Sequence, residues 1–217
     1  MFSREGKMFC SNCGHELAPD ALFCGSCGAN IMALKEHSAL ERLQDLTTVT
    51  PGTTALPDRE RMLSTIEEIE RDFGSEVTPS LADALAGTIL CYVTFHVRGD
   101  DRKPFFERAV RWYRLSGNRG ALGCLLVEER LVRDLKEAIS LLGKIYDESD
   151  RFEPTLCLYA EALYKDGQYV RAYEAAMHIH ELAALQFDGD SIPSMPMQTA
   201  AKAQRAEARR LKKAARQ

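Results

Sequence analysis

The 217-residue chain lacks a long hydrophobic run. Its longest apolar stretch is residues 84–97, which Thr88, Thr94 and His96 interrupt, whereas a membrane-spanning helix needs about 20 apolar residues. The first seven residues, MFSREGK, also lack the apolar segment of a secretory signal. We therefore expect no membrane span and a cytoplasmic protein.

The sequence also lacks the common catalytic motifs. It contains no phosphate-binding loop, nucleophile elbow, dinucleotide fingerprint or His-Glu-x-x-His zinc-protease motif. His178 and His180 are two residues apart, and on a helix such residues point about 200° away from each other, which is wrong for sharing a metal. We expect that the protein is not an enzyme.

Aromatic residues make up only 8% of the chain, and there are only 14 glycines and 8 prolines. No short polar motif repeats, which excludes a fibrous or wholly disordered chain. The hydrophobic content is 45% and the charged content 28%. This composition favours a packed, mostly α-helical protein with one modest core and a second, smaller unit.

Four of the seven cysteines form two Cys-x-x-Cys pairs near the N-terminus, each followed by a glycine: Cys10, Cys13 and Gly14, then Cys24, Cys27 and Gly28. Glycine permits the positive φ that a tight metal-binding turn requires. Four thiolates complete a tetrahedral Zn²⁺ site at about 2.3 Å per ligand. Two disulfides or free thiols are the alternatives, and the expected reducing compartment disfavours disulfides.

Residues 8–30 resemble the short bacterial zinc-ribbon family, in which two Cys-x-x-Cys-Gly knuckles close over a small β-hairpin. Catalytic zinc keeps one coordination position open, but here four sulfurs fill every position, and we interpret the nearby His15 as a polar turn residue. The sequence therefore predicts one structural zinc ion. The ribbon carries acidic side chains and four thiolates, so we expect it to stabilise the protein or dock another protein rather than bind phosphate.

The next segment, 31–56, is expected to be a short amphipathic helix and a linker. Leu40, Leu43 and Leu46 recur at helical spacing, and the Thr-rich stretch 47–56 contains the breakers Pro51 and Gly52. We place a domain boundary there.

A helical domain is predicted over 57–186. Its first helix begins at Pro57 and stops at Gly74, a second helix opens with a cap at Ser80–Asp83 and runs through Val97, and a third spans 105–115. The second of these is apolar on all sides and should lie in the core.

Residues 119–152 and 153–186 contain an internal repeat. Its corresponding residues are 34 positions apart: Leu122 and Leu156, Leu126 and Ala160, Ala138 and Ala172, and Ile145 and Ile179. The second copy resembles a tetratricopeptide helix pair, with Gly167 at the turn. The usual first-position Trp is replaced by Leu156. With residues 81–116 as an extra pair, the resemblance implies an α-solenoid of about three hairpins, and an irregular all-α bundle is the alternative.

In the tetratricopeptide family, ligand peptides lie in a groove lined by the first helix of each pair. Carried over by position, this resemblance implies that another protein is bound by Val127, Arg130, Cys157, Glu161 and Tyr164. These residues do not form a basic clamp for a C-terminal carboxylate, so a different ligand is expected.

The C-terminal residues form a basic tail. A loop is expected at 187–197, because Gly189, Pro193 and Pro196 disfavour regular structure. Residues 198–217 carry seven cations and one acid, a net charge of +6, whereas the remaining residues carry 21 cations and 31 acids, a net charge of −10. On a helix, one cationic stripe would form from Lys202, Arg205, Arg209, Lys212 and Arg216. The stripe can contact nucleic acid or an acidic protein, and a solvated, disordered terminus is the alternative.

Two functions remain open from the sequence. The first is a non-enzymatic protein–protein interaction adaptor or scaffold with a structural zinc site. The second is a nucleic-acid or ribonucleoprotein-associated factor that contacts phosphates through the basic C-terminal tail.

Overall fold

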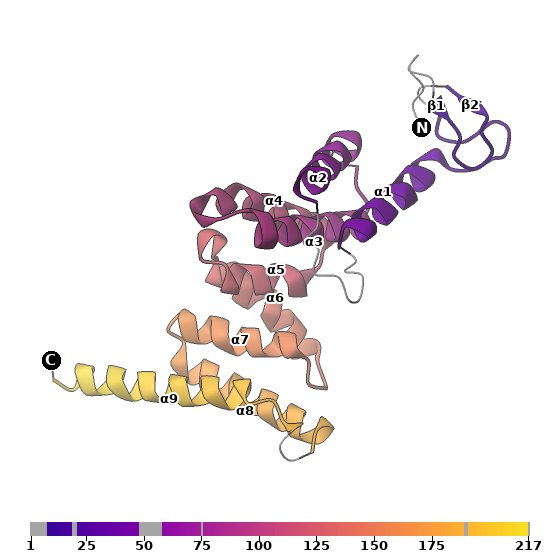
Figure 1. The fold of residues 1–217 in the computed structure, drawn as a ribbon. Helices are drawn as coiled ribbons and strands as arrows, with labels where there is room; N and C mark the ends of the chain where they lie inside the picture. Colours follow the sequence, from indigo (N-terminus) through magenta and orange to yellow (C-terminus); the bar gives the residue numbers. More distant parts are fainter. Residues whose placement is uncertain (1–7, 19–20, 48–57, 75, 189–190, 217) are drawn as a thin grey trace. The chain divides into compact units, whose positions relative to one another are not determined.

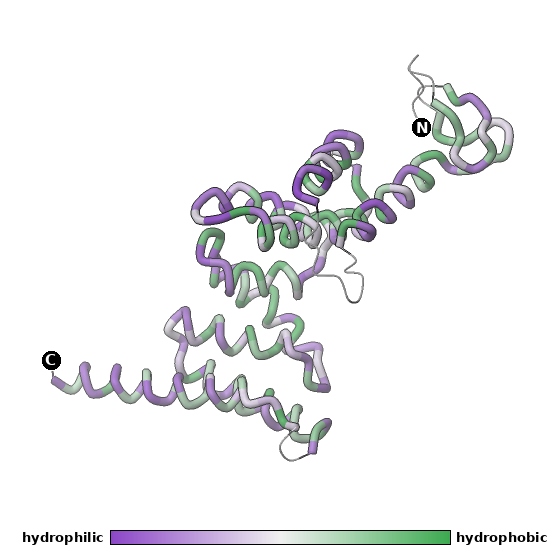
Figure 2. Tube along the Cα trace, in the orientation of Figure 1, coloured by the Kyte–Doolittle hydropathy of each residue, from purple (hydrophilic) through white to green (hydrophobic). Residues whose placement is uncertain are grey.

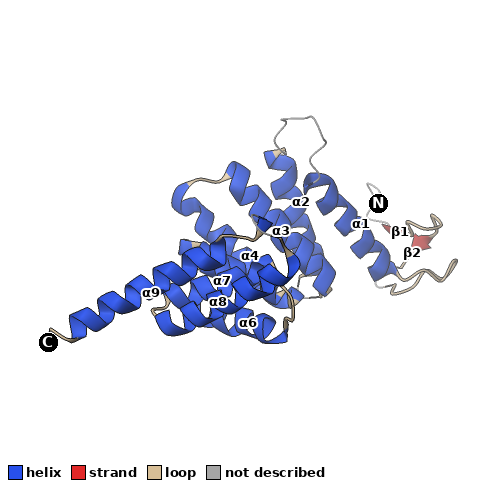
Figure 3. Cartoon of the chain, turned by 90° about the horizontal axis from the view of Figure 1, so that it is seen from below, coloured by secondary structure: helices blue, strands red, loops and turns tan. Residues whose placement is uncertain are grey.

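The protein is mostly helical in a computed structural model that describes residues 8–18, 21–47, 58–74, 76–188 and 191–216. An N-terminal hairpin of two short strands, β1 (Met8–Phe9) and β2 (Glu16–Leu17), precedes nine α-helices within these residues (Figures 1 and 3). The predicted fold class, a small ribbon hairpin followed by helices, is confirmed. The chain divides into two compact units, Met1–Arg98 and Gly99–Gln217.

No helix in the described part of the chain combines the length and apolar character needed to cross a membrane.

The hairpin at the start of the first unit is antiparallel, with Met8 opposite Leu17 and Phe9 opposite Glu16. Its small core consists of Cys10, Leu17, Cys24 and Ile31. Ile31 is the first residue of helix α1 (Ile31–Thr47). The ribbon core therefore continues directly into the first helix.

Helices α1, α2 (Arg59–Phe73) and α3 (Pro79–His96) pack against one another within the first unit. Ala39, Leu43 and Leu46 are the buried side of α1 after its first residue. The predicted linker, 47–56, lies outside the described residues except for Thr47, the last residue of α1. The unit ends at Arg98 rather than at the linker because α1 packs on the two helices that follow it. The proposed domain limits stay a prediction.

Helix α3 begins earlier than expected. Its N-cap is Thr78, whose Oγ1 accepts a hydrogen bond from the Leu81 backbone N–H at 3.3 Å and donates one to Glu36 of α1. Pro79 occupies the first turn, where its missing N–H costs no helical hydrogen bond. The assignment of the cap to Ser80–Asp83 was therefore wrong, because the Thr-Pro pair starts the helix first.

The second unit contains six α-helices in its described residues: α4 (Lys103–Ser116), α5 (Arg119–Glu128), α6 (Leu135–Glu148), α7 (Pro154–Lys165), α8 (Tyr169–Gln186) and α9 (Met195–Ala214). Each packs against the next in chain order, as the ribbon in Figure 1 shows. Trp112 of α4 is 1% exposed. Gly117 ends α4 with φ at 71°, a left-handed conformation that glycine adopts readily.

Corresponding helices of the two predicted copies begin about 34 residues apart in the sequence. Helices α5 and α7 begin at Arg119 and Pro154, and helices α6 and α8 begin at Leu135 and Tyr169. Three aligned pairs are buried in both copies: Leu122 and Leu156, Leu126 and Ala160, and Ala138 and Ala172. In the fourth pair, Ile179 is buried and Ile145 is half-buried.

Helices α5 and α6 approach each other closely at Gly123. A Cβ added at this glycine would lie 2.6 Å from Cγ of Leu142 on α6. The absence of a side chain at Gly123 therefore sets the distance between these two helices.

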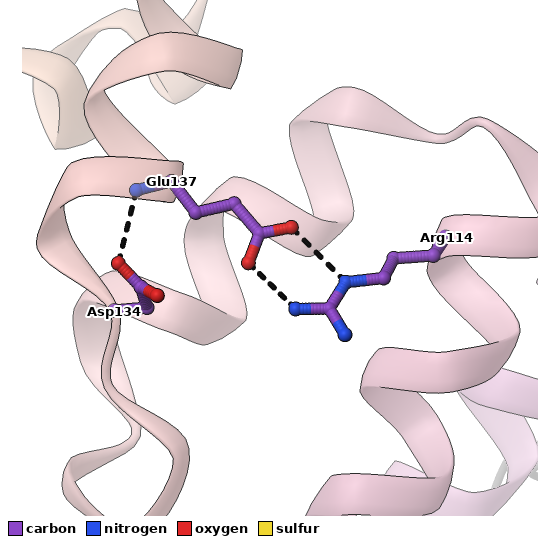
Figure 4. A network of polar contacts seen from close by, with 3 residues as sticks. All are labelled: Arg114, Asp134 and Glu137. Carbon is purple, nitrogen blue, oxygen red and sulfur yellow. Dashed lines mark hydrogen bonds and ion pairs between the residues drawn. The ribbon is translucent and has the colours of Figure 1, made fainter.

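An ion pair joins α4 to α6, as Figure 4 shows. Arg114 donates from Nε to Glu137 Oε1 at 3.0 Å and from Nη2 to Glu137 Oε2 at 2.6 Å. Asp134, the N-cap of α6, accepts from the Glu137 backbone N–H at 3.0 Å. Glu137 therefore lies in the capped first turn of α6 and also forms the ion pair that links this helix to α4.

Helix α9 begins within the segment that the sequence assigned to a loop. The loop prediction was wrong for Met195, Pro196 and Met197, because Pro196 lies in the first helical turn, where proline is tolerated. Pro196, Thr199, Ala200 and Ala203 are buried, and α9 packs against α7 and α8. The N-terminal half of the basic tail is therefore part of the helical unit.

Candidate metal centre

The two cysteine knuckles are built alike. In the first, the Gly14 backbone N–H donates to the Cys10 carbonyl at 2.8 Å, and in the second, Gly28 donates to Cys24 at 2.8 Å. Gly14 and Gly28 have φ values of 74° and 72°, a region that residues with a Cβ rarely adopt. The glycine after each pair therefore closes the turn that directs both thiols to one point.

The four thiols gather into one cluster. Sγ of Cys10 lies 3.7 Å from Sγ of Cys27, and Sγ of Cys13 lies 3.6 Å from Sγ of Cys24. All four sulfurs lie within 4.8 Å of one another. Tetrahedral Zn–S bonds of about 2.3 Å place the sulfurs about 3.8 Å apart. The cluster can therefore hold one zinc ion.

The disulfide alternative does not match this arrangement. All seven cysteines are free. The Cys10–Cys27 and Cys13–Cys24 sulfurs, 3.7 and 3.6 Å apart, are much farther apart than the roughly 2.05 Å of a disulfide bond.

Each knuckle has one buried and one exposed cysteine. Cys10 and Cys24 are each 2% exposed, whereas Cys13 and Cys27 are at the surface. Asn12 Nδ2 donates to Cys27 Sγ at 3.5 Å. This hydrogen bond, together with one from the Ala29 backbone, lowers the pKa of Cys27 to about 6. These hydrogen bonds favour the thiolate of Cys27, which is the form that binds metal, whereas hydrogen bonds with the neighbouring cysteine side chains raise the pKa of Cys13.

His15 contributes its backbone rather than its side chain. Its carbonyl accepts from the Cys10 backbone N–H at 2.8 Å, and its imidazole is not in the four-sulfur cluster. The predicted ligand set of four cysteines therefore matches the cluster.

Residues 9–31 match the family of zinc-ribbon domains. This segment is a zinc-ribbon domain. It contains all four clustered cysteines and accounts for the N-terminal hairpin. No curated protein matches the chain, and no solved structure matches it.

The structure corrects part of the predicted peptide groove. Val127 is fully buried and Cys157 is 3% exposed, so neither side chain presents a surface to a partner. Arg130 is exposed, while Glu161 and Tyr164 of α7 are half-buried. These three residues remain candidates for partner contact.

Lys165 was missed by the sequence reasoning and joins the remaining candidates. Its Nζ donates to the Val127 carbonyl at 3.1 Å and lies 2.9 Å from Glu161 Oε1. The lysine thereby connects the C-terminal ends of α5 and α7. The spacing of four residues from Glu161 on a predicted helix was the signal that could have found it.

All five residues of the predicted cationic stripe are exposed. Lys202, Arg205, Arg209 and Lys212 lie on α9, and Arg216 lies in the turn just after its last residue, Ala214. The Glu207 carboxylate is held by Arg210, which donates to it at 2.8 and 2.6 Å. The one acid in 198–217 is therefore paired with a cation outside the stripe.

Proposed function

We propose that the protein is a non-enzymatic adaptor or scaffold. In this proposal a structural zinc ribbon is joined to helix pairs of tetratricopeptide type, and the helix pairs bind another protein.

The main support for this proposal is the spacing of the helices. Helix α7 starts 35 residues after α5, and α8 starts 34 residues after α6, close to the 34-residue period of tetratricopeptide pairs. Ala138 and Ala172 occupy the same place in each copy and are both 0% exposed. A small buried residue at the same position of each copy supports two helix pairs that pack in the same way.

The turn of the second pair supports the same reading. Gly167 has φ at 83°, its N–H donates to the Tyr164 carbonyl at 3.1 Å, and the Gln168 N–H donates to the Leu163 carbonyl at 2.9 Å. These bonds satisfy the last carbonyls of α7 and reverse the chain within three residues. Short reversals of this kind favour adjacent helices packed in a stack.

The composition of the sulfur cluster supports a structural role for zinc. Four cysteine ligands fill all tetrahedral positions, so none stays open for a water or a substrate. Zinc binding would then supply folding free energy to a domain whose small core, within the residues that the structure describes, has four buried members, Cys10, Leu17, Cys24 and Ile31.

The proposed partner surface consists of Arg130, Glu161, Tyr164 and Lys165. The guanidinium of Arg130 is exposed, and the Tyr164 ring packs 5.7 Å from the Tyr169 ring. Together they offer a cation, a paired carboxylate and a supported aromatic ring. Such a set suits a peptide with an acidic group and an apolar side chain.

The test is quantitative affinity capture with the full-length protein and an Arg130→Ala/Tyr164→Ala variant. A defined protein should be captured by the first and at least tenfold less by the second. The purified partner should then show the same loss of affinity in a direct binding measurement.

A matched control is Lys136→Ala/Tyr173→Ala, which removes one cation and one aromatic ring from exposed positions on α6 and α8. It should bind like the unsubstituted protein. Equal binding by both variants would count against the groove assignment, and capture of no defined protein would count against the adaptor.

A further inference from the structure

Helix α9 and the turn after it carry a run of exposed cations, Lys202, Arg205, Arg209, Lys212 and Arg216. Six cations elsewhere in this unit lie within 4 Å of a carboxylate: Arg102, Lys103, Arg114, Arg119, Arg151 and Lys165. Within the part of the chain that the structure describes, none of these five stripe cations has a carboxylate within 4 Å. The helix therefore presents positive charge that its own surroundings leave uncompensated.

The stripe is also held at a defined place. The N-terminal half of α9 is anchored by Pro196, Thr199, Ala200 and Ala203, which are buried as the helix packs on α7 and α8. The C-terminal part extends beyond α8 (Figures 1 and 3) and is mostly hydrophilic in Figure 2. The anchored half fixes the direction in which the exposed half projects.

The cations repel one another along the helix. Arg205 and Arg209, and Arg209 and Lys213, are four residues apart on α9, and like charges at this spacing destabilise a helix. Glu207, the one acid in the sequence 198–217, is already bound by Arg210. A polyanion that neutralised the stripe would remove this repulsion and stabilise the extended helix.

We propose that α9 is a nucleic-acid contact that binds the phosphate backbone without reading its sequence. Lys202 to Ala214, the last residue of α9, spans about 18 Å at 1.5 Å per residue, and a duplex of that length carries about eleven phosphates. Apart from Leu211, no large apolar side chain follows residue 198, which disfavours insertion of this helix into a membrane surface. The observations favour nucleic acid because its charge is dense and linear, like the stripe.

The contact has a predicted salt dependence. Five cations on duplex DNA give a slope of about −4.5 for log K against log salt concentration, and single-stranded RNA gives about −3.5. On the duplex this corresponds to a loss of about 500-fold in affinity between 50 and 200 mM salt.

The experiment measures binding of the full-length, zinc-loaded protein to a mixed-sequence DNA duplex and to single-stranded RNA by fluorescence anisotropy across this salt range. The test variant is Arg209→Gln/Lys212→Gln/Arg216→Gln. Its slope on duplex DNA should fall in magnitude by about 2.7, from about −4.5 to about −1.8.

A matched control removes the same charge from another place. Arg133→Gln/Lys136→Gln/Lys144→Gln takes three exposed cations from α6 and the turn before it, and its slope should stay at the original value. Unfolding temperatures of both variants show whether the helices remain packed.

Two results would overturn the proposal. The first is an equal loss of affinity in the test and control variants, which would show that the net charge of the protein, and not the position of the stripe, determines binding. The second is failure of the unsubstituted protein to bind either nucleic acid at 50 mM salt, including the case in which it binds polyglutamate instead. Neither result bears on protein binding through Arg130 and Tyr164, so the adaptor proposal is tested separately.

Discussion

Replacing Gly123 by alanine tests the close approach of α5 and α6. The added Cβ would lie 2.6 Å from Cγ and 2.7 Å from Cδ2 of Leu142, whereas carbon atoms in contact are normally about 3.5–4.0 Å apart. Leu142 is 1% exposed, so it has no free space into which to move. The substitution must therefore separate the two helices or strain the leucine.

The expected magnitude combines two opposing effects. Overpacking of a core costs about 1–3 kcal/mol, while alanine gains up to about 1 kcal/mol over glycine inside a helix. Because the overlap involves two carbon atoms of a buried side chain, we expect a net loss of about 1–2 kcal/mol in the free energy of unfolding.

Urea unfolding followed by the fluorescence of Trp112, the only tryptophan, measures this loss in the second unit. With an m value of about 2 kcal/mol per molar, the midpoint should fall by about 0.5–1 M. The control is Gly120→Ala on the same helix, where the added Cβ has no neighbour nearer than 3.7 Å. Its midpoint should stay the same or rise slightly.

A second variant separates steric overlap from other causes. Leu142→Ala alone should cost about 2–5 kcal/mol, but in the Gly123→Ala background it also removes the overlap. The double variant should therefore be less destabilised than the sum of the two single variants. An additive double variant, or a Gly123→Ala midpoint that rises as in the control, would refute the packing argument.

Two further predictions concern the first unit. Cys10→Ser removes one of four zinc ligands, so elemental analysis should show loss of the single bound zinc. Unfolding of the second unit, followed by fluorescence, should stay unchanged. Retention of one zinc per chain would contradict the four-sulfur site. Thr78→Ala removes the cap of α3 and should lower the free energy of unfolding by about 1 kcal/mol, measured by circular dichroism during thermal unfolding. Ser80→Ala is its control and should have little effect. A larger loss of stability for Ser80→Ala than for Thr78→Ala would show that Ser80, and not Thr78, caps the helix.

The metal centre could be predicted from the sequence because its geometry is local. Each knuckle needs only two cysteines and a glycine at fixed spacing, and backbone bonds within the knuckle, such as Gly14 to Cys10 and Gly28 to Cys24, shape it. Only the joining of the two knuckles into one cluster depends on the rest of the ribbon.

The partner surface could not be predicted in the same way. Helix α7 contacts α5, α6, α8 and α9, so more of its circumference is buried than in an isolated helix pair. Matching positions to the tetratricopeptide pattern therefore placed Val127 and Cys157 on a surface that neighbouring helices cover. It also could not show that Lys165 reaches the Val127 carbonyl, 38 residues away.

The sequence by itself determined the zinc ligands, the helical fold class and the spacing of the cationic stripe, because these follow from short-range patterns of residue type. Only the tertiary structure decided that α9 begins at Met195 and lies on α7 and α8. Alanine and threonine suit either a solvated or a packed helix, and burial of Thr199, Ala200 and Ala203 depends on helices distant in sequence. The same packing leaves the stripe facing away from the unit, because its opposite side is the one that is buried.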